Sequence, residues 1–415
     1  MTKKPDAPAI RFKGFSDAWE QRKLSEITDK VTEKNAGLQY VETFTNSAEF
    51  GIISQRDFFD HDIAKLGSLD GYYIVKNEDF VYNPRISTSA PVGPINRNKL
   101  GRTGVMSPLY TVFRPHDIDT TYLEHFFKCG YWHSFMNFNG DSGARSDRFS
   151  IRDNVFFQMP IPIPDIDEQR KIGELLTCLD NLITLHQRKF EKLTNVKKSM
   201  LEKMFPQNGS SYPEIRFKGF TDPWEQRKLG ELVDRVVRKN INNESTLPLT
   251  ISAQYGLVDQ ITYFNNRVAS RDVSNYYLVL NGEFAYNKST SDGYPFGAVK
   301  RLDLYEKGVL STLYIVFAPK KEQQIDSDYL TVFFDTDRWH KGVAERAAEG
   351  ARNHGLLNIS AEDFFDIDLS VPKDIVEQKQ IGAFIRQLDH LITLHQRELE
   401  KLQNIKKSML EKMFV

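Results

Sequence analysis

A stretch rich in basic side chains carries the clearest chemical signal in the sequence. Residues 84–103 contain Arg85, Arg97, Lys99 and Arg102 and no acidic residue, and most of the other positions are Ser, Thr, Asn, Gly or Pro. A guanidinium group can donate paired hydrogen bonds to a phosphate or to a guanine edge, and side-chain amides match adenine. The composition is also compatible with an ordinary solvated loop. We therefore treat this segment as a candidate nucleic-acid contact.

Three further segments carry similar chemistry. The segment from about 134 to 150 contains Gly-Ala-Arg followed closely by a second arginine, and a Gly-Ala-Arg recurs about 200 residues later. The corresponding basic loop of the second half is diluted by acidic residues. The recurrent arginines are equally compatible with a structural role. The additional candidate DNA-binding residues are Arg145, Arg148, Lys288, Lys300, Arg301, Arg352, Asn353 and His354.

The sequence lacks the common motifs of catalytic sites. The sequence has no G-x-x-x-x-G-K-[ST] phosphate loop, no G-x-G-x-x-G, no H-E-x-x-H and no paired C-x-x-C. Asn83-Pro84-Arg85 resembles the start of the Asn-Pro-Pro-aromatic tetrad of amino-methyltransferases, but an arginine replaces the second proline. Its counterpart, Asn287-Lys288, lacks even the first proline. We therefore predict a binding protein without catalytic residues, cofactor or metal of its own.

An internal repeat organises the chain. Residues 10–27 return as residues 215–232 with 14 of 18 identical, and residues 168–205 return as 377–414 with 26 of 38 identical. Between these blocks only landmarks match, among them Ser47, Ala48, Gly51 and Gln55 with Ser252, Ala253, Gly256 and Gln260. The sequence thus predicts two copies of one globular domain, each followed by one helix.

Two stretches in each copy do not match. They run from 84 to about 103 against 288–307, and from about 134 to 150 against 341–357. A shared framework with divergent loops indicates one fold that presents two different surfaces. Drift in unimportant loops is the alternative, although the flanking blocks have stayed nearly identical.

The globular domains are predicted to mix helices and strands, which makes the fold class α+β. Residues 72–83 and 109–115 have the β-branched and aromatic content of strands. Residues 122–135 and 329–343 have the apolar periodicity of helices. We expect a globular domain at 1–163, a helix at 164–205, a linker at 206–214, a second globular domain at 215–371 and a second helix at 372–415.

The two long helices have an explicit start. Asp165 and Asp374 stand three residues before Glu168 and Glu377, the spacing of a capping box. Beyond them, apolar residues recur at heptad spacing over about 38 residues, a rod of roughly 57 Å at 1.5 Å per residue. The sequence therefore predicts two long helices that pair as an antiparallel coiled coil between two pseudo-symmetric domains.

Polar residues in the heptad seam suggest the register of this pairing. When paired residue numbers sum to 584, His186 faces Glu398 and Lys189 faces His395. Such layers fix register and orientation at a cost in stability. We interpret the two histidines as helix-pairing residues rather than metal ligands or bases.

The composition is that of an ordinary globular protein. Hydrophobic residues make up 40% and charged residues 27% of the 415 residues, and the formal net charge is −1. No signal peptide and no apolar stretch of membrane-spanning length is found, so we expect a cytoplasmic protein. Cys129 and Cys178 lack a partner at metal-ligand or redox spacing, and both are predicted to be reduced and buried.

The order of these motifs resembles the specificity subunit of type I restriction-modification systems. The motifs that carry the resemblance are Ile10–Leu24, Pro164–Gln187, Ile215–Leu229 and Pro372–Gln396, and they span nearly the whole chain. The resemblance implies two target-recognition domains that read an asymmetric bipartite sequence in double-stranded DNA. It also implies two adenine-methylating modification subunits, which would hold S-adenosylmethionine, and optional restriction subunits, which would use ATP and Mg²⁺.

Three other functions remain as alternatives. A fused methyltransferase–nuclease would need the motifs that are missing, and a free-standing two-headed DNA-binding regulator should bind its site without partner subunits. A scaffold whose heads bind protein should lack sequence-selective DNA binding. Since the recognition domains vary within the family, the resemblance assigns no base-contacting residue.

Overall fold

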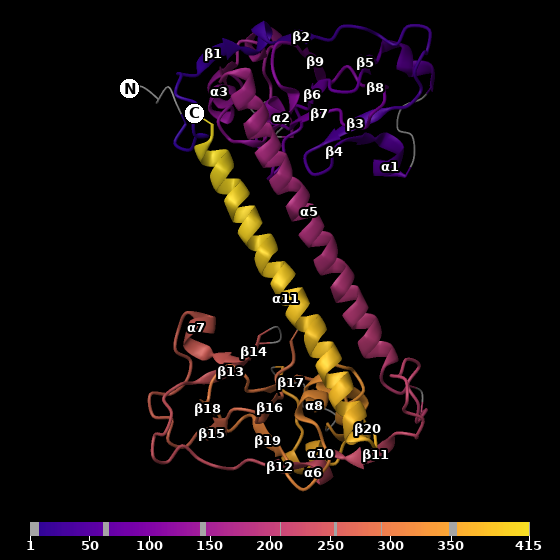
Figure 1. The fold of residues 1–415 in the computed structure, drawn as a ribbon, viewed down its shortest axis with the longest axis vertical. Coiled ribbons are helices and arrows are strands. Elements are labelled where there is room, and N and C mark those ends of the chain that lie inside the picture. The colour runs from indigo at the N-terminus through magenta and orange to yellow at the C-terminus, as the bar shows by residue number, and fades with distance from the viewer. Residues whose placement is uncertain are drawn as a thin grey trace. The chain divides into compact units, whose positions relative to one another are not determined.

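The computed structural model describes residues 8–60, 66–141, 147–207, 209–252, 255–291, 293–347 and 355–414. They form two compact units (Figure 1). Unit 1 comprises the residues up to Gln187 and those from Arg397 onward, and unit 2 comprises Arg188–Gln396. Among the described helices, none combines the length and the apolar character needed to cross a membrane.

Unit 1 is built around an antiparallel four-stranded sheet. Its strand order is β2 (Thr28–Lys30), β9 (Thr111–Pro115), β6 (Phe80–Tyr82) and β7 (Ile95–Arg97). Three further antiparallel pairs accompany it: β1 (Glu20–Lys23) with β10 (Pro160–Ile163), β3 (Phe44–Ser47) with β4 (Gly51–Ser54), and β5 (Tyr73–Val75) with β8 (Gly104–Met106). The helices are α1 (Gln55–Phe59), α2 (Thr120–Lys128), α3 (His133–Asn139), α4 (Asp153–Phe156) and the start of α5 (Ile166–Lys203), with short 3-10 turns at Leu24–Glu26 and Leu66–Gly71.

Alternation along the central strands buries both faces of this sheet. Phe80 and Phe113 stack with ring centroids 5.6 Å apart and belong to the larger core, which also includes residues of α2 and α5. Val81 and Val112, the next residues, belong to a second core with Phe44 of the β3–β4 hairpin. The sheet is therefore a rigid centre from which the connecting loops project.

Unit 2 repeats this topology. Its sheet has the order β12 (Val233–Arg235), β19 (Ile315–Pro319), β16 (Phe284–Asn287) and β17 (Ala298–Arg301). The accompanying pairs are β11 (Glu225–Lys228) with β20 (Asp368–Val371), β13 (Leu249–Ser252) with β14 (Gly256–Asp259), and β15 (Tyr277–Leu280) with β18 (Lys307–Leu310). The helices are α6 (Leu229–Leu232), α7 (Gln260–Phe264), α8 (Ser327–Phe334), α9 (His340–Arg346), α10 (Ala361–Phe365) and α11 (Ile375–Lys412). The predicted α+β class and the internal repeat are confirmed.

The prediction of one continuous helix over 122–135 is wrong. This segment is divided into α2 and α3, because the backbone of Cys129 is extended and a buried Trp132 starts the second helix. The Trp132 indole donates to the carbonyl oxygen of Phe127 at 3.0 Å and thereby fixes the break. In unit 2 the prediction over 329–343 fails in the same way, since α8 ends at Phe334 and Trp339 precedes α9.

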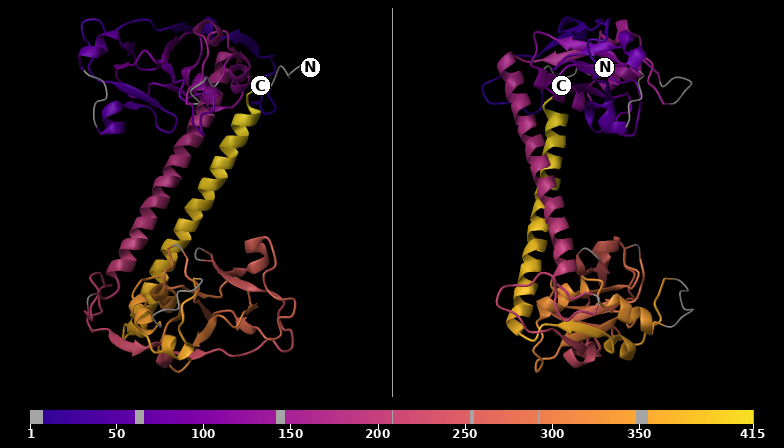
Figure 2. Two further views of the ribbon diagram at one scale, coloured as in Figure 1. Left: turned by 180° about the vertical axis from the view of Figure 1, so that it is seen from behind. Right: turned by 90° about the vertical axis from the view of Figure 1, so that its right-hand side faces the viewer.

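The long helices α5 and α11 have 38 residues each, and each contributes one half to either unit. Within unit 1, the first half of α5 and the last half of α11 lie side by side in opposite directions (Figure 2). Leu402, Ile405 and Met409 of α11 pack against the unit 1 core, and Lys406 forms an ion pair with Asp180 of α5. Within unit 2, Lys197 of α5 pairs with Asp389 of α11 at 2.6 Å. The antiparallel sense of the predicted pairing is confirmed.

Glu168 and Glu377 do not act as capping-box residues. Asp165 and Asp374 do cap α5 and α11, because their carboxylates accept from Asp167 N and Val376 N at 2.8 Å. The Glu168 carboxylate is buried and accepts instead from Arg11 Nε and Nη2, both at 2.8 Å. The two oxygens of Glu377 accept from Arg216 at 2.7 and 2.8 Å. These bidentate pairs tie the retained Ile-Arg-Phe segments to the helix starts.

The prediction for the cysteines holds at only one of the two positions. Cys129 is buried, and burial raises the pKa of its thiol to about 12. Cys178 is exposed, which contradicts the prediction, because it lies on the face of α5 that points away from the unit 1 core.

Candidate nucleic-acid interface

The two divergent stretches of unit 1 meet in space. The amide of Ile86 donates to the carbonyl oxygen of Asp147 at 3.0 Å, and the amide of Phe149 donates to that of Pro84 at 2.7 Å. Arg85 and Arg148 are opposite each other in this short antiparallel bridge. Residues more than 60 positions apart thus form one composite surface beside the end of β6.

Unit 2 makes the same junction with different side chains. The amide of Leu357 donates to the carbonyl oxygen of Lys288 at 3.0 Å, and the amide of Thr290 donates to that of Gly355 at 2.6 Å. Here Ser289 is opposite Leu356 where unit 1 has two arginines. A shared backbone arrangement therefore presents different chemistry in the two units.

Arg85 and Arg148 are predicted contacts with accessible side chains. Both side chains are exposed, and within the described part of unit 1 neither guanidinium lies within ion-pairing distance of a carboxylate. The Arg85 amide donates to Asn83 Oδ1 at 3.0 Å, which fixes the backbone at the start of the loop. Two guanidinium groups on one bridge suit phosphate contact or guanine readout.

Other residues of the predicted set bind carboxylates of the protein itself. The Arg97 side chain is only 9% exposed and contacts Glu124 at 2.5 Å and Glu78 at 2.9 Å. Lys99 contacts Glu124 at 3.1 Å, and Arg102 holds Glu42 with two bonds of 2.7 and 2.8 Å. Arg97 is therefore a scaffold residue, while the side chains of Lys99 and Arg102 remain about half exposed.

The charged residues around Glu124 show why Arg97 stays paired with this carboxylate. Burial alone would raise the pKa of Glu124, but Lys128, Arg97 and Lys99 outweigh it and lower this pKa to about 2. A carboxylate with this environment stays ionised throughout the physiological range. It holds Arg97 against α2 rather than leaving the guanidinium to a ligand.

The equivalent residues of unit 2 behave in the same way. Arg301, in the β17 position that corresponds to Arg97 in β7, contacts Asp303 at 2.7 Å and Asp328 at 2.8 Å. Lys300 contacts Asp335 at 2.7 Å and is largely buried. Lys288 is half-buried, and its ammonium donates to the carbonyl oxygen of Ile359 at 3.4 Å. Arg145, Arg352, Asn353 and His354 lie outside the described residues.

A cavity of about 530 Å³ opens beside the bridge of unit 1. Its lining combines the rings of Tyr82 and Tyr110 with Arg148, Phe149 and Lys30. Aromatic faces next to cationic groups suit a base or a phosphate. Sequence reasoning missed Tyr110. The available signal was the retention of a Leu-Tyr pair at 109–110 and at 313–314. In the structure both leucines, Leu109 and Leu313, are exposed.

Asn83 is occupied by structural hydrogen bonds. Its Nδ2 donates to the carbonyl oxygen of Asn46 at 2.8 Å, while its Oδ1 accepts from the Arg85 amide. Asn287 Oδ1 similarly accepts from the Ser289 amide at 3.0 Å. The retained asparagines therefore shape the loops, which accounts for Asn83-Pro84 without methyltransferase chemistry.

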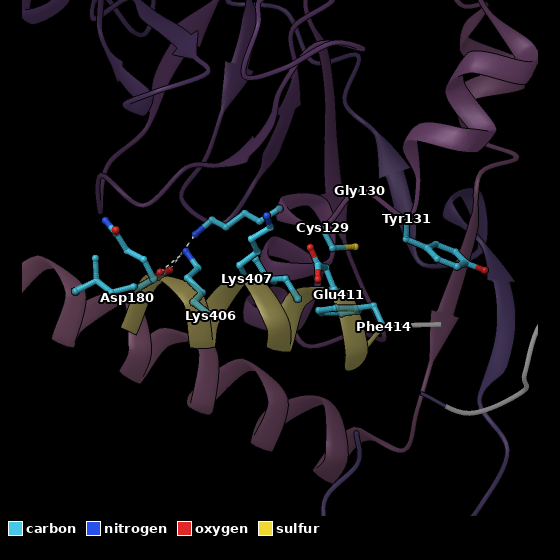
Figure 3. A pocket seen from close by; sticks show the side chains of 12 residues that line it. Cys129, Gly130, Tyr131, Asp180, Lys406, Lys407, Glu411 and Phe414 are labelled. Carbon is cyan, nitrogen blue, oxygen red and sulfur yellow. Dashed lines mark hydrogen bonds and ion pairs between the residues drawn. The ribbon is translucent and has the colours of Figure 1, made fainter. Parts of the chain in front are cut away.

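The helix-pairing residues lie near the middle of α5 and α11. His186, His395 and Glu398 are half-buried, and Lys189 is exposed. Asp180 forms an ion pair with Lys406, and Lys197 forms one with Asp389, at sequence positions on either side of these residues. Figure 3 shows Asp180 and Lys406 pointing toward one another between α5 and α11. The facing of His186 with Glu398 and of Lys189 with His395 stays a prediction.

Comparison with known proteins gives a consistent picture. The Type I restriction enzyme MjaVIII specificity subunit of Methanocaldococcus jannaschii is 24% identical over 274 residues, which cover 62% of this chain and 61% of that protein. The putative type I restriction enzyme MjaX specificity subunit of the same organism is 30% identical over 84 residues, which cover 20% of each chain. The chain thus spans about three fifths or less of the length of these curated relatives.

A solved structure supports the fold. The type I restriction-modification system S subunit from M. genitalium superimposes with a TM-score of 0.60 at 12% identity, covering 99% of both chains. The family model for the type I restriction modification DNA specificity domain matches residues 16–195 and matches again at 221–404. Since these two tandem matches cover most of the sequence, the chain belongs to the family of type I restriction-modification DNA specificity proteins.

Proposed function

We propose that this chain is the DNA sequence-recognition subunit of a type I restriction-modification complex. It has no catalytic residues of its own and reads an asymmetric, bipartite target in double-stranded DNA, one half with each unit. The observation that carries the proposal is the junction of two divergent stretches on a retained scaffold in both units. A protein that reads two different half-sites needs this combination of constant frame and variable contact surface.

The partners follow from this role. Two modification subunits would methylate adenine at the recognised site, using S-adenosylmethionine that they hold themselves. Restriction subunits, where present, would supply the sites for ATP and Mg²⁺. The complex would act in the cytoplasm.

The proposed DNA contacts fall into two groups. Arg85 and Arg148 form the unit 1 bridge and are the proposed central contacts, while Lys99 and Arg102 follow the other end of β7 and are proposed as separate phosphate contacts. Lys288 lies at the unit 2 junction, and Arg145, Arg352, Asn353 and His354, which lie outside the described residues, are kept as candidates from the sequence. Arg97, Lys300 and Arg301 are assigned to the scaffold, because carboxylates of the protein hold them.

The function is tested by sequencing methylated adenines in a host that expresses the chain with its modification subunit. We expect one bipartite motif with two different halves. Replacing residues 84–94 and 141–150 together by those of a relative with another target should change one half only. A simultaneous change of both halves, or methylation without any bipartite motif, would contradict the proposal. A free-standing regulator would instead bind its site fully without the modification subunit.

A further inference from the structure

Three exposed aromatic rings cluster at one edge of unit 1, away from the sheet core. Phe50 is at the tip of the β3–β4 hairpin and 61% exposed, and Phe58 and Phe59 are exposed on α1. The ring centroids of Phe50 and Phe58 are 6.2 Å apart, and those of Phe58 and Phe59 are 4.6 Å apart. Three contacting aromatic side chains on a surface have an unfavourable free energy of exposure to water unless something covers them. We call these residues the Phe50 cluster.

Unit 2 carries exposed aromatic residues at the same three positions, although among these three residues only Tyr263 and Phe264 have their rings in contact. Tyr255 follows β13 and is 60% exposed, while Tyr263 and Phe264 are exposed on α7 with ring centroids 5.0 Å apart. Each residue of this Tyr255 cluster stands at the repeat position of one member of the Phe50 cluster. The residues between them are not retained, since Arg56 and Asp57 correspond to Ile261 and Thr262. Aromatic character is thus kept where the neighbouring surface has changed.

The landmarks retained between the two hairpins serve to display these rings. Ser47 Oγ accepts from the amide of Phe50 at 3.3 Å, and Ser252 Oγ accepts from that of Tyr255 at 3.2 Å. Gly51 and Gly256 follow with φ of 70° and 79°, a conformation that a residue with a side chain rarely adopts. The chain therefore keeps the turn that holds an aromatic ring in water.

The short helices are held equally firmly. The amide of Gln55 donates to the carbonyl oxygen of Thr43 at 2.8 Å, and that of Gln260 donates to Pro248 at 2.8 Å. Beneath the first hairpin, buried Asn46 donates to the carbonyl oxygen of Val81 at 2.7 Å and accepts from Asn96 at 2.7 Å. A rigid platform lowers the entropic cost of binding through the rings it displays.

The charges around the Phe50 cluster argue against DNA as its occupant. The exposed charged residues next to the cluster in the sequence are Glu49, Arg56, Asp57 and Asp60, and Arg102, which pairs with Glu42, also interacts with Asp57. The four neighbouring residues carry a net negative charge, which disfavours phosphates at these rings. Two units that read different DNA nevertheless share the feature, so the occupant is common to both. An apolar patch rimmed by charge is typical of a protein interface, where aromatic residues dominate the binding energy.

We propose that the Phe50 cluster and the Tyr255 cluster are two docking sites, each for one copy of the modification subunit, which contacts the rings through an apolar patch of its own. This inference rests on the proposed function, because it takes the methyltransferase partner from there. It adds the surface on which the catalytic partner is placed beside each recognition unit.

The test compares the full-length chain with two variants in complex with its modification subunit. One variant carries Phe50→Ser, Phe58→Ser and Phe59→Ser, and the other carries Tyr255→Ser, Tyr263→Ser and Phe264→Ser. Val237→Ser is the control, because Val237 is 59% exposed and lies outside both clusters and outside the divergent stretches. Native mass spectrometry counts the modification subunits bound, and titration gives the affinity for each. We expect two subunits on the parent and the control, and an affinity at least tenfold weaker for one of the two subunits on each variant.

Different outcomes of this experiment would contradict the docking sites and the proposed function. A parent chain that binds no modification subunit contradicts the proposed function. Two subunits bound with unchanged affinity on both variants overturn only the docking sites. Weakened DNA binding by a variant with unchanged subunit affinity would assign the rings to DNA, and loss of self-association would assign them to a second copy of this chain; either result overturns the proposal. Should a triple variant fail to fold by circular dichroism, the single changes Phe58→Glu and Tyr263→Glu decide by the same criteria.

Discussion

The amide of Phe149 donates to the carbonyl oxygen of Pro84 at 2.7 Å and joins the two stretches that differ most between the repeats. This contact makes one surface from two variable segments, with Arg85 and Arg148 opposite each other upon it. Variation in either segment alters the same patch. A recognition surface built in this way can change its chemistry while the sheet beneath keeps its register.

The first prediction concerns the salt dependence of DNA binding. If Arg85 and Arg148 neutralise one phosphate each, replacing both by Ala should reduce the slope of log K against log salt by about 1.8, at about 0.9 per phosphate. Lys13→Ala removes an exposed charge from the retained N-terminal segment and serves as the control. Fluorescence anisotropy between about 50 and 200 mM salt measures the slopes. An unchanged slope in the double variant would place the phosphate contacts elsewhere.

The second prediction separates the scaffold arginine from its neighbours. Arg97→Ala leaves buried Glu124 with only Lys128 and Lys99 as partners, and should cost about 2–3 kcal/mol, below the range for a buried charge left with no partner. Arg102→Ala removes a half-exposed pair with Glu42 and should cost no more than about 1 kcal/mol. The two losses of unfolding free energy are measured by urea unfolding, with hydrogen exchange in unit 1 peptides as the readout. Equal losses in the two variants would mean that burial of Arg97 does not decide its role.

The internal repeat made much of the fold predictable. Residues that match between the two copies showed that the chain consists of two equivalent domains, each followed by a long helix. The capped starts of α5 and α11 and the apolar seam followed from spacing alone. The breaks after Lys128 and Phe334 did not, since the apolar periodicity continues across them and the buried Trp132 and Trp339 redirect the chain. Tertiary packing here outweighs local pattern.

The candidate site was harder to predict, because a count of basic residues does not say which way each side chain points. Arg97 is two positions after the buried Ile95 in β7, so alternation along the strand turns it inward. Its retention as Arg301 in the other copy was a signal of a structural role. No local pattern could have placed Arg148 opposite Arg85, since that neighbourhood arises only when the chain folds back across more than 60 residues.

A third prediction concerns stability at mildly acidic pH. His125 is buried, its Nε2 lies 3.1 Å from Thr177 Oγ1, and burial followed by the charge of Lys128 lowers its pKa to about 4. Asp180 and Glu124 oppose this shift, while Lys406 adds to it. Below about pH 6.5 the unfolded chain takes up a proton that the folded chain refuses, so unit 1 should lose stability as the pH falls from about 6.5 to about 4. The unfolding free energy should fall by at most about 1.4 kcal/mol per pH unit, because one group titrates.

The comparison for this prediction is His125→Asn, which removes the titrating group and keeps a polar side chain. Unfolding free energies of the parent should fall between pH 6.5 and pH 5, and those of the variant should fall less. Parallel curves for the two proteins would show that another group controls the acid response.

The last prediction concerns the close contact of α11 with the start of α8. A Cβ atom added to Gly382 would lie 2.8 Å from Asp328 Cβ and 3.0 Å from the backbone nitrogen of Tyr329. Alanine favours a helix over glycine by about 1 kcal/mol, but the crowding in a packed contact costs about 1–3 kcal/mol. Gly382→Ala should therefore destabilise unit 2 despite its better helix propensity. Ala383→Gly, at the exposed neighbouring position, provides the control and should cost about 1 kcal/mol from propensity alone. Hydrogen exchange of unit 2 peptides in the full-length chain measures both changes. A stabilised Gly382→Ala protein would show that α8 can move aside, and that this glycine is not required for the packing of the long helix on the recognition unit.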